Sequence, residues 1–411
     1  LMSCLKKAPF VFLFIVIVFL HLEETRGDGL NITPFVALEQ EYNDNIFFDD
    51  DDETNDFIAT ISPGLELIER TERLDTRLSA QINNLIYYDN DELNSVDQYY
   101  TGRLRYRITP KTDVSAEAGY TRDSRSDRDI EETGLVLSTA TRHRQRYSLS
   151  GRYMLSEKTA ATLSYAYDQD DFDDSEFDDS RSHSTNLGFT HNISYLIPQT
   201  LGRMNLGYAR YDFPDSVVDN YTWTIGASRD FTEILTFLVD FGIRYTRSEI
   251  EVQRIETLNS GSTDFFAPWP PKDEEKSTGW GGVGEVALSY RGELTDGSLS
   301  FFRDVRAASG RTGATERTAL VFEIGRRITE KLRGNLSAGY YLNNSEGDDF
   351  AAEDIDEKTL RFQTRARYEF TKDIALEASY TFTTIRDSEE NTTKNRNLVF
   401  MRAVFQYPIL E

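Results

Sequence analysis

The sequence predicts an all-β protein, a transmembrane antiparallel up-and-down β-barrel of about 18 strands. Three observations support this fold class. Apolar and polar residues alternate along many short segments, tight turns and long acidic loops alternate between those segments, and the chain begins with the layout of an export signal. We predict two parts, a signal peptide over residues 1–29 and an outer-membrane barrel over residues 30–411.

The export signal comes first in the chain. Lys6 and Lys7 precede an apolar run over Ala8–Leu20, and polar residues follow it. The run is shorter than the roughly 20 apolar residues that a membrane-spanning helix needs, so we expect a removable secretory signal. No small-x-small pattern fixes the cleavage site, which we place near Gly27–Leu30. An uncleaved inner-membrane anchor is the alternative.

The clearest strand pattern runs over Leu360–Phe370. Leu360, Phe362 and Tyr368 fall on one face, whereas Arg361, Arg365 and Arg367 fall on the other. Successive side chains of a strand point to opposite sides, so this segment separates an apolar medium from a wet, charged one. After a turn, the same alternation resumes from Ile374 to Phe382, which predicts a hairpin.

The same alternation recurs along the chain. We count about 18 such segments between Ile32 and Tyr407, each close to the 9 to 11 residues of a tilted spanning strand. An even number of strands places both ends of the chain on the periplasmic side. Further clear examples are Tyr100–Ile108, Arg144–Leu155 and Leu235–Tyr245.

The connections give an independent signal. Short turns alternating with longer outer loops are typical of outer-membrane barrels. The predicted turns are Arg70–Glu72, Pro110–Asp113, Ser156–Lys158, Leu196–Thr200, Leu294–Gly297, Thr329–Lys331 and Thr371–Asp373. The predicted loops are Phe48–Asp56, Asp123–Glu132, Asp168–Ser180, Gln253–Thr278, Asn343–Asp356 and Arg386–Thr393. A soluble β-sandwich also alternates apolar and polar residues, but the single repeated strand length favours the barrel.

Composition excludes several kinds of chemistry. A formal net charge of −25 disfavours a nucleic-acid partner. The only cysteine, Cys4, lies in the signal, so the barrel has no thiol for a disulfide, a nucleophile or a metal. Only His143, His183 and His191 supply imidazoles beyond the signal. We therefore expect no catalytic residues, no bound metal and no cofactor.

Two runs near the start of the barrel resemble a known family. Tyr42–Phe47 ends the first expected strand, and Phe57–Leu65 begins the second. Both look like the β-barrel porin type 2 family, and this likeness in motif covers about the first seventy residues. Proteins of that family often accompany exopolysaccharide and exosortase-linked surface systems. The resemblance therefore implies an outer-membrane location, a role in polymer export, and polysaccharide export subunits as partners.

Charged residues on the expected inner faces would line a wet pore. Carboxylates and guanidinium groups paired across strands would stiffen the wall, whereas unpaired arginine rows would favour anionic solutes or acidic sugars. The sequence does not decide between a stiffening ion-pair network and a selective pore lining. The pore-lining candidates are Glu39, Glu41, Arg103, Arg105, Arg107, Arg146, Arg152, Arg244, Glu323, Arg361, Arg365, Arg367 and Glu377.

Two features of the expected loops are further candidates. Carboxylates cluster at Asp49–Glu53 and Asp170–Asp179, but they lack the glycine and spacing of a calcium loop, so we expect solvated loops. Trp269 and Trp280, near several prolines in the longest loop, could form a constriction or a sugar-stacking surface. If that loop folded inward, it would plug the barrel.

The sequence thus predicts a channel or porin-like transport component of the bacterial outer membrane. Its surroundings would be outer-membrane lipid and lipopolysaccharide. Phe400, Phe405 and Tyr407 have the spacing that the barrel-insertion machinery recognises, although Pro408 and further residues follow them. Two alternatives remain, a barrel that serves as a scaffold for a periplasmic partner and an outer-membrane enzyme.

Overall fold

The computed structural model describes residues 29–127, 129–130, 140–253, 272–307, 313–345 and 355–409, and the predicted signal peptide, apart from Gly29, lies outside them. In these ranges the chain forms eighteen strands and one 3-10 helix, η1 (Asp91–Leu93). No helix among them is long and apolar enough to cross a membrane. The strands are β1 (Leu30–Asn43), β2 (Asp56–Arg70), β3 (Leu74–Tyr87), β4 (Ser95–Thr109), β5 (Thr112–Asp123), β6 (Arg142–Ser156), β7 (Thr159–Phe172), β8 (Ser180–Asn192), β9 (Thr200–Asp212), β10 (Ser216–Thr232), β11 (Leu235–Gln253), β12 (Lys272–Arg291), β13 (Thr295–Ala307), β14 (Ala314–Arg327), β15 (Leu332–Ser345), β16 (Ile355–Glu369), β17 (Ile374–Asp387) and β18 (Thr392–Gln406).

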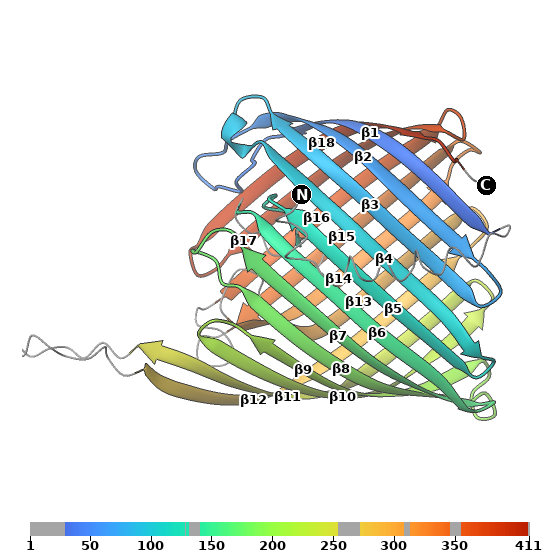
Figure 1. The fold of residues 1–411 in the computed structure, drawn as a ribbon. Helices are drawn as coiled ribbons and strands as arrows, with labels where there is room; N and C mark the ends of the chain where they lie inside the picture. The colour runs from blue at the N-terminus through green and yellow to red at the C-terminus, as the bar shows by residue number, and fades with distance from the viewer. Residues whose placement is uncertain are drawn as a thin grey trace, which may run out of the picture.

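The strands close into one antiparallel barrel, as predicted (Figure 1). Each strand pairs with the next, and β18 pairs with β1 from Phe35 opposite Gln406 to Asn43 opposite Leu398. Two backbone bonds, from Tyr407 to Pro34 and from Ile409 to Ile32, extend this junction to the rim. The start of β1 and the end of β18 therefore lie at the same rim.

The outer surface of the wall is apolar because every second side chain points outward. Leu149, Leu163, Trp223, Phe241 and Leu320 are all exposed there. An apolar exterior on a closed barrel is stable in lipid, where no backbone edge is left without a partner. The chain is thus an outer-membrane β-barrel.

An aromatic row crosses the outer surface of β9 to β12. The rings of Tyr208, Tyr221, Tyr245 and Trp280 follow one another at centroid distances of 5.0, 6.3 and 5.0 Å. Such amphipathic rings gather where hydrocarbon meets head groups. The row therefore marks the outer edge of the lipid-facing band on this part of the wall.

The connections follow the expected alternation with three corrections. Each of the seven predicted turns falls at a connection between strands, although Pro110–Asp113 extends into β5 and Leu294–Gly297 extends into β13. The sequence pattern missed an eighth turn at 233–234, between β10 and β11. The connection at 213–215, between β9 and β10, is short although it lies on the loop side. The predicted loop Gln253–Thr278 is too long, because β12 already begins at Lys272.

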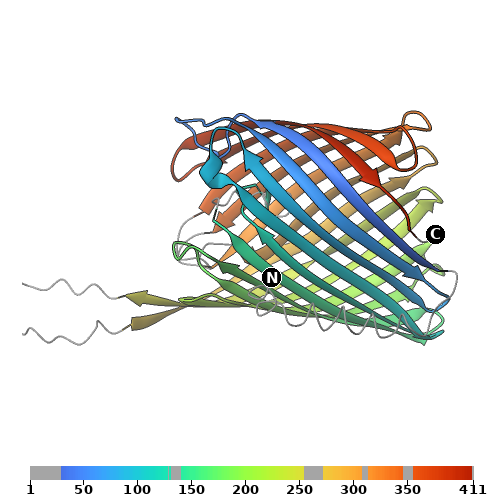
Figure 2. The ribbon, with the colours of Figure 1, turned by 45° about the horizontal axis from the view of Figure 1, so that its top comes forward.

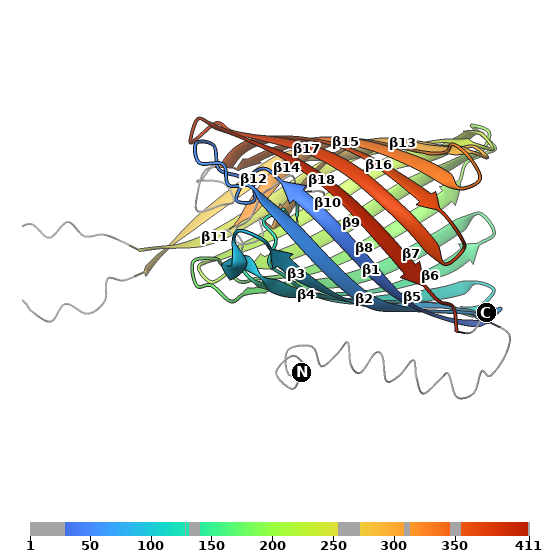
Figure 3. The ribbon, with the colours of Figure 1, turned by 90° about the horizontal axis from the view of Figure 1, so that it is seen from above.

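The hairpin of β11 and β12 is longer than the others. Its strands contain 19 and 20 residues, and it projects beyond the rim opposite the C-terminus (Figures 1 and 2). On its other side β12 pairs with β13 only from Gly284–Arg291. Seen from above, the hairpin diverges from the rest of the wall (Figure 3).

Candidate functional site: the inner wall and an inward-folded loop

The strand register places all thirteen predicted pore-lining residues on the inner side of the wall. For example, the successive inner-face positions of β3 to β6 are Arg77, Arg103, Glu117 and Ser148. On the opposite part of the wall, Glu323 faces Ser298 and Ser337. The interior is therefore charged and polar, as a water-filled lumen requires.

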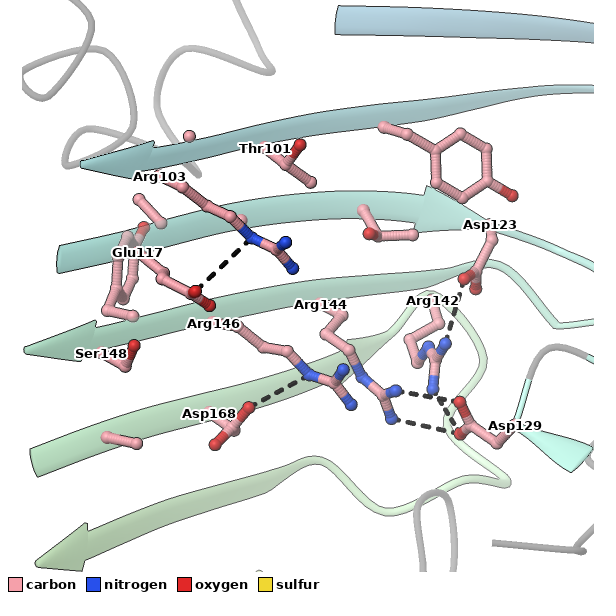
Figure 4. Close-up of a pocket in the computed structure, with 17 residues that line it drawn as sticks. Thr101, Arg103, Glu117, Asp123, Asp129, Arg142, Arg144, Arg146, Ser148 and Asp168 are labelled. Carbon is pink, nitrogen blue, oxygen red and sulfur yellow. Dashed lines mark hydrogen bonds and ion pairs between the residues drawn. The ribbon is translucent and has the colours of Figure 1, made fainter. Parts of the chain in front are cut away.

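Ion pairs join neighbouring strands on the inner face of β4 to β7 (Figure 4). The Arg103 Nε lies 3.4 Å from a Glu117 oxygen, and the Arg146 Nε lies 3.1 Å from Asp168. Arg107 lies 3.8 Å from Asp113. The side chains of these pairs are exposed to solvent, so each pair contributes little to stability and leaves its guanidinium accessible from the lumen.

A second group of ion pairs links strands on another part of the inner wall. The Arg402 Nε lies 3.6 Å from Glu39, and the Arg367 guanidinium donates to Glu377 at 2.5 Å. The Arg365 guanidinium lies 5.9 Å from the ring centroid of Phe400. The strands β16, β17, β18 and β1 are thereby linked across their inner face.

Three predicted arginines have no ion pair among the described residues. These are Arg105 on β4, Arg152 on β6 and Arg365 on β16. Arg105 and Arg152 both lie in the half of the barrel nearest the turns. Cross-strand ion pairing therefore describes most of the predicted inner-wall charges. Of the predicted arginines, only these three fit the other interpretation, in which unpaired cations favour anionic solutes.

The loop that follows β5 folds inward across the loop-side mouth. The Arg125 guanidinium of this loop donates two hydrogen bonds to the Glu41 carboxylate of β1, at 3.1 and 2.9 Å. Asp127 accepts a hydrogen bond from Arg396 of β18 at 2.8 Å. Asp129 accepts from Arg142 of β6 at 2.6 Å. The loop therefore connects β6 with β1 and β18, and we call residues 124–130, as far as they are described, the mouth loop.

Apolar packing holds the same loop. Ile130 is fully buried against Phe48 of the β1–β2 connection and Ile385 of β17. The Arg396 guanidinium stacks 4.2 Å from the ring centroid of Phe48. The Ser126 hydroxyl donates to the Ile46 carbonyl oxygen at 3.1 Å. A folded loop with both ionic and apolar anchors narrows the mouth in a defined position.

The charges of the mouth loop stay ionised in spite of burial. Burial alone would raise the pKa of Asp127, but the guanidinium groups of Arg125 and Arg396 hold that pKa well below its usual range. Burial alone would lower the pKa of Arg125, whereas Asp127 and Glu41 raise it above its usual value. The loop is therefore an ion-pair latch near neutral pH.

The inner face from β7 to β10, which we call the neutral arc, is mostly uncharged. It carries hydroxyl and amide groups on small side chains, and the Asn205 amide donates to the Thr224 hydroxyl at 3.1 Å. These groups are Ser164, Ser184, Asn186, Asn205, Thr222 and Thr224. Such a surface can hydrogen-bond a neutral polar solute without fixing a charge.

A glycine on β10 leaves room for side chains of the two neighbouring strands to meet above it. Arg203 of β9 reaches Asp240 of β11 at 2.8 Å over Gly226, which lies opposite both. A Cβ on Gly226 would lie 2.0 Å from the Val239 carbonyl oxygen. Only glycine allows the backbones to approach this closely.

The predicted tryptophan constriction is corrected by the structure. Trp280 lies on β12, not in a loop, and its ring is 72% exposed on the outer surface beside Tyr245. The ring follows the alternation of Gly282, Gly284 and Val286, which also face outward. Trp269 lies outside the described residues.

The acidic clusters and histidines have other partners. Asp170 lies on β7 and binds Arg144 at 2.6 Å, so it belongs to the wall and not to a solvated loop. His143 lies 3.3 Å from Asp173. Among the described residues no group of histidine, aspartate and glutamate side chains has an arrangement that could hold a metal ion.

The sequence pattern missed the mouth loop. Arg125, Asp127 and Asp129 lie in a run of charges that we expected to be a solvated outer loop. Ile130, a lone apolar residue in that run, was the one local signal of burial. The partners Glu41 and Arg396 lie far away in the sequence, so no local pattern joins them.

No known protein family matches the chain, and no curated protein does either. Among solved structures, it is similar to the siderophore receptor PirA from Pseudomonas aeruginosa, at 12% identity and a TM-score of 0.42, over 92% of this chain and 80% of that one. It is also similar to OccAB4 from Acinetobacter baumannii, at 9% identity and a TM-score of 0.45, over 93% of this chain and 99% of that one. OccK3 from Pseudomonas aeruginosa matches at 10% identity and a TM-score of 0.43, over 92% and 96% of the two chains. At these values the likeness says nothing about function.

Proposed function

We propose that this barrel is an outer-membrane channel for hydrophilic solutes. The observation that carries the proposal is the contrast across the wall, where ionic and hydroxyl side chains face inward and apolar ones face outward. A barrel of about 18 strands is wide enough to leave an aqueous passage between its inner side chains. A scaffold that only docks a partner would not need a continuous polar inner wall.

The mouth loop sets the size limit of this channel. It is anchored to β1, β6 and β18 and so narrows the loop-side mouth on the ionic part of the wall. The neutral arc of β7 to β10 lies along the remaining passage. We infer that solutes contact hydroxyl and amide groups there, while the three unpaired arginines bias the pore towards anions.

Conductance of single purified barrels in a planar bilayer tests this function. We expect discrete, voltage-independent channel steps from protein that migrates as a folded barrel before heating. Folded protein that inserts without any conductance would contradict the channel and favour the scaffold.

We further propose that sugars are among the solutes, and polysaccharide export is the role that the family resemblance implies. The neutral arc supports this substrate class, since hydroxyl and amide groups match the hydrogen-bonding groups of carbohydrates. Added neutral oligosaccharides should then interrupt the current in a concentration-dependent way. Equal conductance with and without oligosaccharide would remove sugars from the proposal while leaving the channel intact.

A further inference from the structure

A cavity of about 410 Å³ lies on the inner side of β12 to β16, at the end of the barrel nearest the turns, and we call it the turn-side cavity. The strand register aligns its inner-face residues into two successive rows, each with one residue from each of the five strands. From β12 to β16, the first row contains Ser289, Ser298, Glu323, Ser337 and Gln363. The second row, which is closer to the turns, contains Arg291, Asp296, Gly325, Asn335 and Arg365.

An ion pair occupies the centre of the second row. The Arg333 guanidinium donates to Asp296 at 2.5 Å and to the Asn335 side-chain oxygen at 3.3 Å. These side chains meet over Gly325, where a Cβ would lie 2.8 Å from both Arg333 and Asn335. The Asp296 carboxylate is therefore already paired, and the glycine leaves room for its partner.

Three charges of the turn-side cavity have no such partner. The side chains of Arg291, Glu323 and Arg365 make no ion pair and no hydrogen bond with the described residues, and all three are exposed. Glu323 lies two strands from each arginine, which is about 10 Å across the wall at about 4.8 Å per strand. A carboxylate thus lies between two guanidinium groups, and these charges leave the cavity with a net positive charge.

The sign and the number of these charges indicate the ligand. A guanidinium group binds a carboxylate through charge-assisted hydrogen bonds, and a carboxylate binds an ammonium group in the same way. An acidic amino acid carries two carboxylates and one ammonium group, so it matches all three charges. A neutral sugar would leave the three charges without partners of opposite sign, and a simple anion would be repelled by Glu323.

The surroundings of Glu323 suit a solute that binds and leaves. Hydroxyl and amide groups of Ser298, Ser337 and Gln363 lie in the same row and supply further donors and acceptors. Each exposed ion pair contributes little, so binding is weak and reversible. A channel needs such a site, because a solute that bound tightly would not pass on.

We propose that the turn-side cavity binds an acidic amino acid, with its two carboxylates on Arg291 and Arg365 and its ammonium group on Glu323. Passage of this solute rests on the channel proposed above, whereas its binding requires only the folded inner wall. The site adds a solute class to the sugars of the neutral arc, on a different part of the wall.

Saturation-transfer NMR with the folded barrel in a nonionic detergent tests the ligand, because it detects weak binding. Three solutes of similar size are compared, namely L-glutamate, L-glutamine, which lacks one carboxylate, and glutarate, which lacks the ammonium group. For the native protein we expect a Kd for glutamate about two- to five-fold below that for glutamine, which is the contribution of one exposed ion pair. Equal values, or no binding of glutamate to folded barrels, would overturn the proposal.

Substitutions assign the contacts. Replacing both Arg291 and Arg365 with glutamine should abolish the preference for glutamate over glutamine. Glu323→Gln should shift the preference from glutamate towards glutarate about two- to five-fold, because only glutamate has an ammonium group for that carboxylate. An unchanged ratio of glutamate to glutarate binding in this variant would refute the role of Glu323.

The matched control removes two arginines that lie outside the cavity. Arg326 and Arg386 occupy outer-face positions of β14 and β17, and replacing both with glutamine changes the net charge equally. This variant should keep the native preference, and an equal loss would assign the preference to overall charge and refute the site. Conductance is measured in parallel. Barrels that conduct without this preference keep the channel and lose the ligand, whereas barrels that bind with it and do not conduct keep the ligand and lose the channel.

Discussion

The inner wall formed by β16 to β18 and β1 to β6 differs from the inner wall formed by β7 to β10. The first, the ionic arc, is covered with cross-strand ion pairs and holds the mouth loop through Glu41, Arg396 and Arg142. The second, the neutral arc, carries small polar side chains and glycines, and its charges cross over glycine gaps. One arc is thus specified by charge partners and the other by close backbone approach.

This difference has a physical cause. Opposite charges that pair in a water-filled interior destabilise the protein little, whereas a buried charge without a partner destabilises it strongly. The loop brings its own charges and so needs an arc that supplies opposite ones. The neutral arc does not contact the mouth loop, and the end of β13 packs against it through Tyr211 and Val218.

The largest effect on the stability of the whole barrel is expected in the neutral arc. Gly226→Ala should destabilise the barrel by roughly 1–3 kcal/mol, because the new Cβ has no room beside the Val239 carbonyl oxygen and Asp240. Gly151→Ala is the matched control, since nothing lies within 4 Å of that Cβ position. Thermal unfolding followed by heat-dependent gel migration should separate the two variants, and equal midpoints would contradict the close approach.

The next effect is expected in the ionic arc, where it is confined to the mouth loop and leaves the stability of the barrel wall unchanged. Arg125→Ala leaves Glu41 buried without its guanidinium partner and leaves Asp127 with Arg396 alone, which costs the latched loop roughly 3–5 kcal/mol. The mouth loop should leave the lumen and single-channel conductance should rise. Arg386→Ala, an exposed arginine of β17 that does not contact the loop, is the control. Unchanged conductance in both variants would show that the loop does not restrict the pore.

Ion selectivity should respond less strongly. Replacing Arg105 and Arg152 with glutamine removes two cations that lack ion pairs in the described wall, and the permeability ratio should shift roughly two- to five-fold towards cations at low salt. Neutralising Arg103, Arg105 and Arg107 together should shift it further, because Glu117 and Asp113 lose their partners. The reversal potential across a salt gradient measures both, and no shift in either would leave the charges with a purely structural role.

The smallest effect is that of pH on the latch. The pKa of Asp127 lies below its ordinary value, so its contribution is fully present above about pH 4 and is lost only as the pH falls towards the lowered pKa. Conductance of the native channel should therefore be the same at pH 7 and pH 5. Asp127→Asn should raise conductance at both values, and an opening of the native channel between pH 7 and pH 5 would contradict this assignment.

Much of the fold was readable in the sequence because lipid and water impose a period of two on every strand. The segments around Leu360–Phe370 and Tyr100–Ile108 show it directly, and the inner-face arginines follow from it. Trp280 was misplaced because the loop was drawn too long. Continuing the alternation backwards from Leu288 and Val286 would have put its ring on the outer face.

The rest was not readable because it depends on contacts between distant residues. The pairing of Arg125 with Glu41 joins positions 84 apart, and that of Arg396 with Asp127 joins positions 269 apart. Charge runs look alike in the sequence whether they are solvated or latched. The point at which β12 stops pairing with β13, at Gly284, likewise depends on where β13 and β14 pack, which alternation along one strand does not specify.

The most direct test of the central claim, that water touches one side of each strand and lipid the other, is alternate-residue labelling of β16. Single cysteines placed in turn over residues 360–367, in a Cys4→Ser background, are treated in vesicles with a membrane-impermeant thiol reagent. We predict rapid labelling at Arg361, Gln363, Arg365 and Arg367, and protection at Leu360, Phe362, Thr364 and Ala366. Uniform labelling along the segment would contradict the account.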